Sequence, residues 1–256
     1  MHKMETMTLK QRACEFIREQ ILVGGVQAGD QISDVTLSKQ IGISRTPVRE
    51  AISQLESEGL LEQIPHVGVF VRKPGRQELV ELYELREILE ARAAERAASR
   101  LTQEQLDRLQ VLCDDYERIA RTVRDTRTPG PDEDMARCMI MADLEFHLII
   151  ARGCGNSHLA KAISDSRMMT HLMGRRYLPT TIPFPDKMAA TAREHQAVLD
   201  ALRQHDAARA RDLMIEHIRL AQQVMDKWYD EVEQRQGGQA QAYPPSIQAL
   251  IGRMTR

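Results

Sequence analysis

The sequence predicts a mainly α-helical protein in two parts: an N-terminal α domain that carries a small β-hairpin, and a C-terminal all-α bundle of six to seven helices. Two observations predict this division. Residues 35–59 have the spacing of two short helices joined by a tight turn, and residues 60–71 are rich in strand-forming side chains. From residue 77 to about residue 233, apolar side chains recur every three to four positions without strand-like alternation.

The first helix is expected over residues 8–23, where Ala13, Phe16, Ile17 and Ile21 share one face. Two consecutive glycines end it. Residues 27–34 then form a connecting turn. We expect this helix to pack behind the two that follow.

The next segment has the signals of a helix-turn-helix. Val35–Ile41 forms a short helix with an apolar side, and Gly42 ends it because glycine adopts the left-handed conformation at little cost. Ser44 is expected to be the N-cap of the second helix, with its hydroxyl accepting from amides of the first turn. Pro47 is tolerated in that turn, and the helix continues to about Glu58.

Polar side chains gather at the start of this second helix, which we call the reading helix. Arg45 and Arg49 lie one turn apart. Such a helix fits the major groove of DNA with its first turn facing the bases, and an arginine can bind a guanine through two parallel hydrogen bonds. The hydroxyls of Ser44 and Thr46 can hold phosphates. Residues 60–71 supply a hairpin, with Gly68 where a tight approach needs no side chain, so residues 8–73 form a winged helix-turn-helix.

The stretch ISRTPVREAISQLESEGLLE, followed by VGVFV, closely resembles the winged helix-turn-helix of GntR-family bacterial transcription regulators. The resemblance implies that Arg45 and Arg49 read bases, that Thr46 contacts a phosphate or a base, and that Gly68 is the wing glycine. Many relatives carry a basic or polar residue just before this glycine. This chain has a valine there, so we expect His66 to reach the minor groove instead. The predicted DNA contacts are Ser44, Arg45, Thr46, Arg49, His66 and Gly68.

Overall charge does not point to nucleic acid. The formal net charge is −2, and between Met1 and Gly75 nine Lys and Arg residues are balanced by nine Asp and Glu residues. Relatives often carry an arginine just before the first helix of the motif, where this chain has Ser33 and Asp34 instead. The phosphate contact made by that arginine in the family is therefore not assigned to this chain. DNA affinity should therefore need two copies of the reading head and should fall steeply with salt.

Composition is that of an ordinary globular protein, with 42% hydrophobic and 28% charged residues. The cysteines form no CxxC pair, no signal peptide precedes them, and no apolar run approaches the length of a membrane span. We therefore expect a cytoplasmic protein with reduced thiols and no membrane partner. A redox switch through Cys138 or Cys154 is an alternative that no spacing supports.

Residues 73–76 mark a domain boundary, because proline and glycine end the last strand and the period of the apolar residues changes to that of a helix. Residues 77–233 form the second domain, and residues 236–256 are expected to be a loose tail. Thr102 with Gln105 predicts a capping box, and Asp206 predicts an N-cap. The expected helices are Gln77–Arg100, Thr102–Asp125, Asp132–Ala151, Ser157–Tyr177, Lys187–Gln204 and Asp206–Glu233.

Three helices of this bundle carry metal-ligand side chains on apolar faces. Asp143 and His147 are four residues apart, so both leave the same side of one helix. His195 and His217 lie on the packing faces of the last two helices. A single histidine on such a face is more often a core residue than a ligand. Three histidines and one aspartate that could converge are nevertheless enough for a divalent metal.

The pattern DLEFH, then EH, then HI resembles the FCD ligand-binding domain of the FadR-like branch of the GntR family, and the helix count looks like the VanR type. The resemblance implies that Asp143, His147, His195 and His217 bind a divalent metal, with zinc expected first and nickel, manganese or iron as alternatives. It also implies a small organic or sugar acid as effector. Arg86 matches an arginine of the family's first bundle helix and is predicted to bind the effector carboxylate. A solvent-facing or dimer-face role is the alternative.

These observations predict a homodimeric, metabolite-responsive transcription regulator, expected to be a repressor, that binds a double-stranded DNA operator and is not an enzyme. Two other functions stay open at this point. A metal-dependent hydrolase with a DNA-binding appendage is one, although no general base or nucleophile is evident near the four ligands. A regulator that senses the metal itself is the other.

Overall fold

The computed structural model describes residues 7–23, 25–73, 75–126, 131–174 and 184–236. Contacts within the chain divide it into two compact units, one built on residues up to Gly75 and the other on the helices from Arg76 onward. The two units are described one after the other below.

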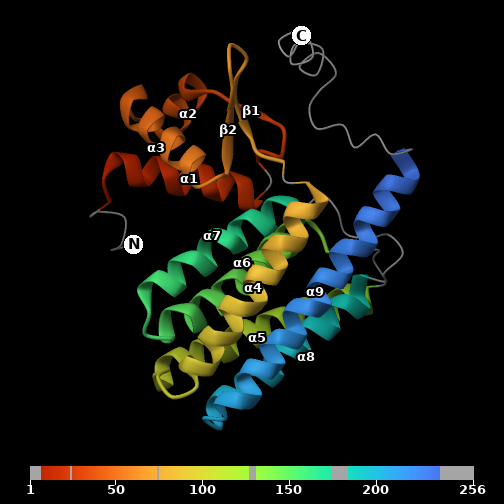
Figure 1. Cartoon of the computed structure of the whole chain (residues 1–256). Coiled ribbons are helices and arrows are strands. Elements are labelled where there is room, and N and C mark those ends of the chain that lie inside the picture. The colour runs from red at the N-terminus through yellow and green to blue at the C-terminus, as the bar shows by residue number, and fades with distance from the viewer. Residues whose placement is uncertain (1–6, 24, 74, 127–130, 175–183, 237–256) are drawn as a thin grey trace. The chain divides into compact units, whose positions relative to one another are not determined.

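The first unit contains three helices and a small antiparallel sheet (Figure 1). Helices α1 and α3 pack against each other. Ala13 and Ile17 of α1, and Val48 and Leu55 of α3, have no exposed surface. Fully burying a large aliphatic side chain stabilises a fold by about 1.5–3 kcal/mol, so this contact fixes the orientation of the reading helix. The elements are α1 (Leu9–Val23), β1 (Gln31–Ile32), α2 (Asp34–Ile41), α3 (Arg45–Ser57), β2 (Leu61–Ile64) and β3 (Gly68–Val71).

The sheet has one strand more than the sequence predicts. β3 lies in the middle and pairs with β2, as expected for the hairpin, and also with β1, in the order β1-β3-β2. Gln31 pairs with Phe70, and Ile32 pairs with Val69. The segment predicted as a turn therefore contains a strand of two residues, which is too short to show alternation.

The caps of the two motif helices were predicted with one error. Gly42 ends α2 in the left-handed conformation, with φ of 74°, as expected. Ser44 is the N-cap residue of α3, but its side chain makes no capping hydrogen bond. A capping hydroxyl bonds the second or third amide of the helix, and the third residue here is Pro47, which has no N–H. The Ser44 hydroxyl is therefore not used in capping.

The second unit consists of helices only, among the residues that the structure describes. The predicted starts and ends are correct to within a few residues. The end of α4, the start of α8 and the end of α9 each differ by three residues. Helix α8 begins at Phe184 rather than at Lys187, with Pro185 in its first turn, where proline is tolerated. The predicted end at Tyr177 and nearly all of the predicted tail lie outside the described residues. The helices are α4 (Arg76–Ala97), α5 (Gln103–Asp125), α6 (Glu133–Gly153), α7 (Ser157–Gly174), α8 (Phe184–Arg203) and α9 (Ala207–Gln236).

Side chains at two helix starts confirm the predicted caps. Thr102 and Gln105 form the reciprocal capping box of α5. Asp206 accepts from the amide of Arg209 at 2.9 Å at the start of α9. Inside the unit, α5 packs against α6 and α8, and α6 packs against α4. No helix in the described part of the chain is both long enough and apolar enough to cross a membrane.

The four cysteines differ in access. Cys138 is exposed, whereas Cys14, Cys113 and Cys154 are buried. Burial raises the pKa of the Cys113 thiol to about 12, and the thiolate is the reactive form. We expect a disulfide reagent at pH 8 to modify one thiol per chain rapidly, and the other three only after unfolding. Rapid modification of more than one thiol in the native protein, or a Cys138→Ser variant that still reacts rapidly, would contradict this.

Candidate functional site

The predicted DNA-contacting side chains of α3 lie on its exposed side. Arg45, Thr46 and Arg49 are exposed, whereas Val48 and Ala51 are completely buried. Because the buried face fixes the rotation of the helix, the first turn presents its polar side chains to solvent. This is the arrangement that a groove-binding helix requires.

An acidic residue that the sequence analysis did not predict as part of this surface contacts both arginines. The Asp34 carboxylate accepts hydrogen bonds from Arg45 and Arg49, and the closest distances are 3.0 Å and 2.6 Å respectively. The hydrogen bond from Arg49 is the largest influence on the pKa of Asp34 and lowers it. Asp34 is eleven residues before Arg45. No helical spacing therefore links them in the sequence.

The two predicted wing residues lie at the turn between β2 and β3. His66 has a φ of 59°, and Gly68 has a φ of 140° at the start of β3. A Cβ atom on Gly68 would lie 2.6 Å from Nε2 of Gln31 in β1, so a side chain there would displace Gln31. That glutamine also donates to the carbonyl of Val67 at 3.2 Å. The positive φ is therefore the main reason for glycine at this position, because the flexible end of Gln31 could move aside.

The four predicted metal ligands come together inside the second unit. Ligand atoms of Asp143, His147, His195 and His217 all lie within 4.8 Å of one another, and the three histidines are buried. They come from α6, α8 and α9. Oδ1 of Asp143 lies 3.4 Å from Nε2 of His195 and 3.9 Å from Nε2 of His147. With metal–ligand bonds of about 2.1 Å, neighbouring ligands stand about 3.0–3.4 Å apart, so the cluster, with separations of up to 4.8 Å, is slightly wider than a metal site with its ion bound.

Carboxylates beside His147 and His217 indicate which ring nitrogens carry hydrogen and which present lone pairs to the centre of the cluster. Nδ1 of His147 lies 2.6 Å from the Glu90 carboxylate, and Nδ1 of His217 lies 2.7 Å from that of Glu194. An ionised carboxylate only accepts, so Nδ1 of His217 carries the hydrogen that Glu194 accepts, and its Nε2 carries a lone pair. The separation between His147 and Glu90 favours the same tautomer for His147, although that ring is not aligned for a hydrogen bond within the described residues. The Nε2 atoms of His147 and His217 are 3.2 Å apart. Two lone pairs at this distance repel unless a positive charge lies between them.

A proton is a poor source of that charge. Burial, together with the nearby Arg167 guanidinium, holds the pKa of His147 well below its usual value. Burial also lowers the pKa of His217. Neutral imidazoles are the form that binds metal ions. The residues present therefore fit a divalent metal ion on their own geometry and chemistry.

His195 is held by ring contacts instead of a carboxylate. Its ring stacks on Phe146 with centroids 4.3 Å apart, and the edge of Tyr116 packs at 5.6 Å. Its buried Nε2 atom lies 3.4 Å from Oδ1 of Asp143 but is not aligned for a hydrogen bond within the described part of the chain. A buried nitrogen of this kind normally has a partner, and a metal ion would supply one.

Four charged side chains around the cluster form a buried network. Arg167 binds Asp143 at 2.5 Å and Glu90 at 3.0 Å. Arg86 donates to Glu90 at 2.8 Å and to the hydroxyl of Thr170 at 3.2 Å. Burial alone would raise the pKa of Glu90, but Arg167 and then Arg86 outweigh it and hold that pKa well below its usual value. The predicted effector residue Arg86 therefore lies beside the cluster, where it holds Glu90.

Glu90, Glu194 and Arg167 were not predicted from the sequence. Metal-binding histidines commonly donate their second ring N–H to a carboxylate, and Glu90 and Glu194 are placed for that role. Two spacings could have indicated them, since Glu90 is one helical turn after Arg86 and Glu194 directly precedes His195. No spacing marks Arg167, because its partners lie on two other helices.

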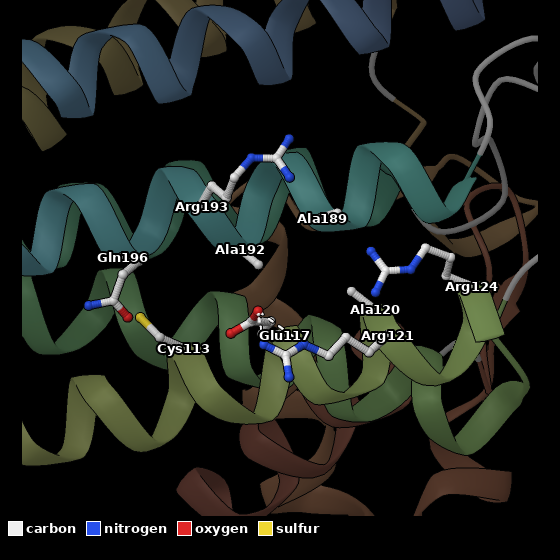
Figure 2. A pocket seen from close by; sticks show the side chains of 9 residues that line it. All are labelled: Cys113, Glu117, Ala120, Arg121, Arg124, Ala189, Ala192, Arg193 and Gln196. Carbon is white, nitrogen blue, oxygen red and sulfur yellow. Dashed lines mark hydrogen bonds and ion pairs between the residues drawn. The ribbon is translucent and has the colours of Figure 1, made fainter.

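A cavity of about 580 Å³ lies between α5 and α8, outside this cluster (Figure 2). Figure 2 shows the small side chains of Ala120, Ala189 and Ala192 between the two helices. Of its three arginines, Arg121 is paired with Glu117 at 2.5 Å. None of the predicted site residues lines it. The lining residues are Cys113, Glu117, Ala120, Arg121, Arg124, Ala189, Ala192, Arg193 and Gln196.

Two family models match this chain and together account for most of it. The model described as "Bacterial regulatory proteins, gntR family" matches residues 9–71, and the model described as "FCD domain" matches residues 81–220. The first range contains the reading helix and the wing. The second contains all four predicted metal ligands.

Proteins of known description resemble the chain over most of its length. A probable D-xylose utilization operon transcriptional repressor of Paenarthrobacter nicotinovorans is 28% identical over 82% of this chain and 86% of its own. A putative L-lactate dehydrogenase operon regulatory protein of Escherichia coli is 28% identical over 89% of this chain and 90% of its own. The solved structure of E. coli McbR/YncC has the same fold, with a TM-score of 0.74 and 24% identity over 89% of this chain and all of that one.

Proposed function

Because this chain belongs to the GntR family of bacterial regulatory proteins and carries an FCD domain, which makes it a transcription regulator rather than an enzyme, we propose that a metal-bound carboxylate effector controls its DNA binding. In this proposal residues 8–73 read DNA and residues 77–233 bind the metal and the effector. The single observation that carries it is the convergence of one carboxylate and three imidazoles inside the FCD domain.

DNA reading depends on the exposed first turn of α3. Arg45 and Arg49 bind base edges, Thr46 and Ser44 contact phosphates, and the wing brings His66 and Gly68 to the minor groove. The unused hydroxyl of Ser44 supports its role, since capping does not consume it. Two heads in a homodimer read the two halves of a symmetric operator. The chain acts as a repressor, which is also how the P. nicotinovorans relative is described.

Asp143, His147, His195 and His217 hold the metal. Imidazole and carboxylate ligands suit zinc first, with nickel, manganese or iron as alternatives. Glu90 and Glu194 fix the rings of His147 and His217 so that each Nε2 atom faces the centre. Arg167 donates to Oδ2 of Asp143, which leaves Oδ1 facing the histidines. When bound, a divalent ion supplies open coordination positions at which a carboxylate can bind.

The buried charges support an anionic effector. Two carboxylates (Asp143, Glu90) pair with two guanidiniums (Arg86, Arg167), and a third carboxylate (Glu194) bonds to His217, so these five side chains together carry one negative charge. A divalent ion turns this into one positive charge, and one carboxylate then neutralises it. We therefore propose a small organic, hydroxy or sugar acid as the effector. Direct binding of its carboxylate by Arg86 stays a prediction, since that guanidinium already holds Glu90.

The test compares metal-loaded and metal-stripped protein in mobility-shift titrations on the chain's own upstream DNA, with a panel of small organic, hydroxy and sugar acids. Allosteric coupling commonly changes affinity by about 5- to 150-fold. At least one acid should weaken DNA binding of the metal-loaded protein by about tenfold or more and leave the stripped protein unaffected. An equal response of the stripped protein would contradict the proposal. Switching by metal alone, with no acid active, would indicate a regulator that senses the metal.

The carboxylates behind the histidines should set metal affinity. Replacing Glu90 by Gln removes the acceptor charge next to His147, and loss of such a partner typically weakens metal binding by about 10- to 100-fold. Competition with a chromogenic chelator measures this on protein shown by circular dichroism to be folded. Glu84→Gln, an exposed glutamate on the same helix, is the matched control. Equal metal affinity of the Glu90 variant and this control would show that Glu90 does not support the metal.

A further inference from the structure

One carboxylate holds both arginines that are proposed to read bases. Oδ2 of Asp34 accepts from Nε of Arg49 at 2.6 Å, and from Nη2 and Nε of Arg45 at 3.0 Å and 3.2 Å. Oδ1 also accepts from Nη2 of Arg45 at 3.2 Å. Asp34 lies in the first turn of α2, while both arginines lie in the first two turns of α3. The contact therefore joins the two helices of the motif at the surface that faces DNA.

The bonded atoms leave the base-reading edge of each guanidinium free. A guanidinium has one edge formed by Nε and Nη2 and another formed by its two terminal nitrogens. Asp34 occupies the first edge of Arg45 and the Nε atom of Arg49. The terminal edge of each side chain still offers two parallel N–H groups, which is what guanine O6 and N7 accept.

The Asp34 carboxylate is less exposed than the two guanidiniums that it binds. The Asp34 side chain is 19% exposed, whereas the side chains of Arg45 and Arg49 are 51% and 64% exposed. The carboxylate thus lies behind the guanidiniums. A long exposed arginine loses rotamer freedom when it binds, and a partner that holds it beforehand reduces this cost.

We propose that Asp34 is a positioning residue for sequence specificity. It binds Arg45 and Arg49 on the Nε side of each guanidinium, so that the terminal edge of each can bind a guanine. This inference rests on the proposed base-reading role of the two arginines. Asp34 also cancels one of their two positive charges, which lowers the charge-driven affinity for any DNA. Both effects increase the ratio of the affinity for the preferred DNA sequence to the affinity for random DNA.

An autoinhibitory contact is the competing explanation, in which Asp34 occupies the arginines and must release them before DNA binds. The two explanations differ in what the loss of the carboxylate does. Without a positioning residue, affinity for the preferred site falls while affinity for random DNA rises. Without an inhibitor, both affinities rise together.

The experiment first selects a preferred duplex with the wild-type protein from a random pool. Dissociation constants for this duplex and for a random duplex are then measured over a range of salt concentrations. The variants are Asp34→Asn, Asp34→Glu, Arg45→Ala with Arg49→Ala, and Glu50→Gln. Glu50 is the matched control, because it is exposed on α3, carries the same charge as Asp34 and makes no side-chain bond to either arginine in the described part of the chain.

Asp34→Asn should reduce the ratio of random to preferred dissociation constants by about tenfold, within the range expected for arginine–guanine pairs. Asp34→Glu should restore most of it, and Glu50→Gln should leave it near wild type. An unchanged ratio for Asp34→Asn, a parallel gain on both duplexes, or an equal loss for Glu50→Gln would overturn the inference. Undiminished binding by the double arginine variant would instead refute the proposed function. Melting curves of all variants show whether they are folded.

Discussion

Replacing Arg45 and Arg49 together by alanine is expected to abolish sequence-specific DNA binding. Each arginine–guanine pair contributes about 1–3 kcal/mol of discrimination, so losing both should weaken binding to the preferred duplex by about 100-fold or more. The slope of log affinity against log salt should become shallower by less than two charges, because the two arginines contact bases and Asp34 already neutralises one of them. Fluorescence anisotropy with a labelled duplex measures both quantities.

The control for this variant removes the same charge elsewhere. Arg118 and Arg121 are exposed on α5, and each pairs with an acidic side chain within one turn of its own helix. Their double alanine variant should bind the duplex as the wild type does. Arg45 and Arg49 are themselves more than half exposed, so their loss should change the melting temperature little. Equal DNA affinities of the two double variants would contradict the assignment of the reading surface.

Replacing His147 by alanine should have the largest effect in the helical unit. Its Nε2 atom lies 3.2 Å from that of His217, inside the cluster, and the substitution removes one of the four proposed ligands. An ion present at about 1,000 times its dissociation constant stabilises the folded state by about 4 kcal/mol. A domain of this size gains about 2–4 °C in melting temperature for each kcal/mol, so chelation should lower that of the wild type by about 10 °C.

The variant tests this through its response to the chelator. His147→Ala also leaves a cavity, which lowers the melting temperature for an unrelated reason. The decisive quantity is therefore the difference with and without chelator, which should be close to zero in the variant. His158→Ala is the matched control, since His158 is an exposed histidine outside the cluster, and it should respond as the wild type does. A chelator response preserved in His147→Ala would contradict the ligand assignment.

Periodicity predicted the helices well because each amphipathic segment buries one face, and that face is visible in the spacing of residues such as Val48, Ala51 and Leu55. The convergence of the four ligands rested on the resemblance to the FCD domain as much as on spacing. Only Asp143 and His147 share a helix, and the sequence does not state which later helices pack beside them.

The residues that were missed share a physical reason. Glu90, Arg167 and Asp34 are charged, and a charged residue in a helix is most often exposed. Glu90 and Arg167 are buried because they neutralise each other and the atoms around them, which depends on three helices meeting. Asp34 is paired across a tight turn. The two-residue strand β1 was missed because its pairing with β3, not its own composition, makes it a strand.

The metal content of the purified protein tests the central claim most directly. Protein purified without metal-affinity resin is loaded with zinc, nickel or manganese in turn, dialysed, and analysed for metal per chain. The convergence of Asp143, His147, His195 and His217 predicts about one tightly held divalent ion per chain for at least one of these metals. It also predicts almost none for His147→Ala. Wild-type protein that retains no metal after each loading, or a variant that retains as much as the wild type, would contradict the account.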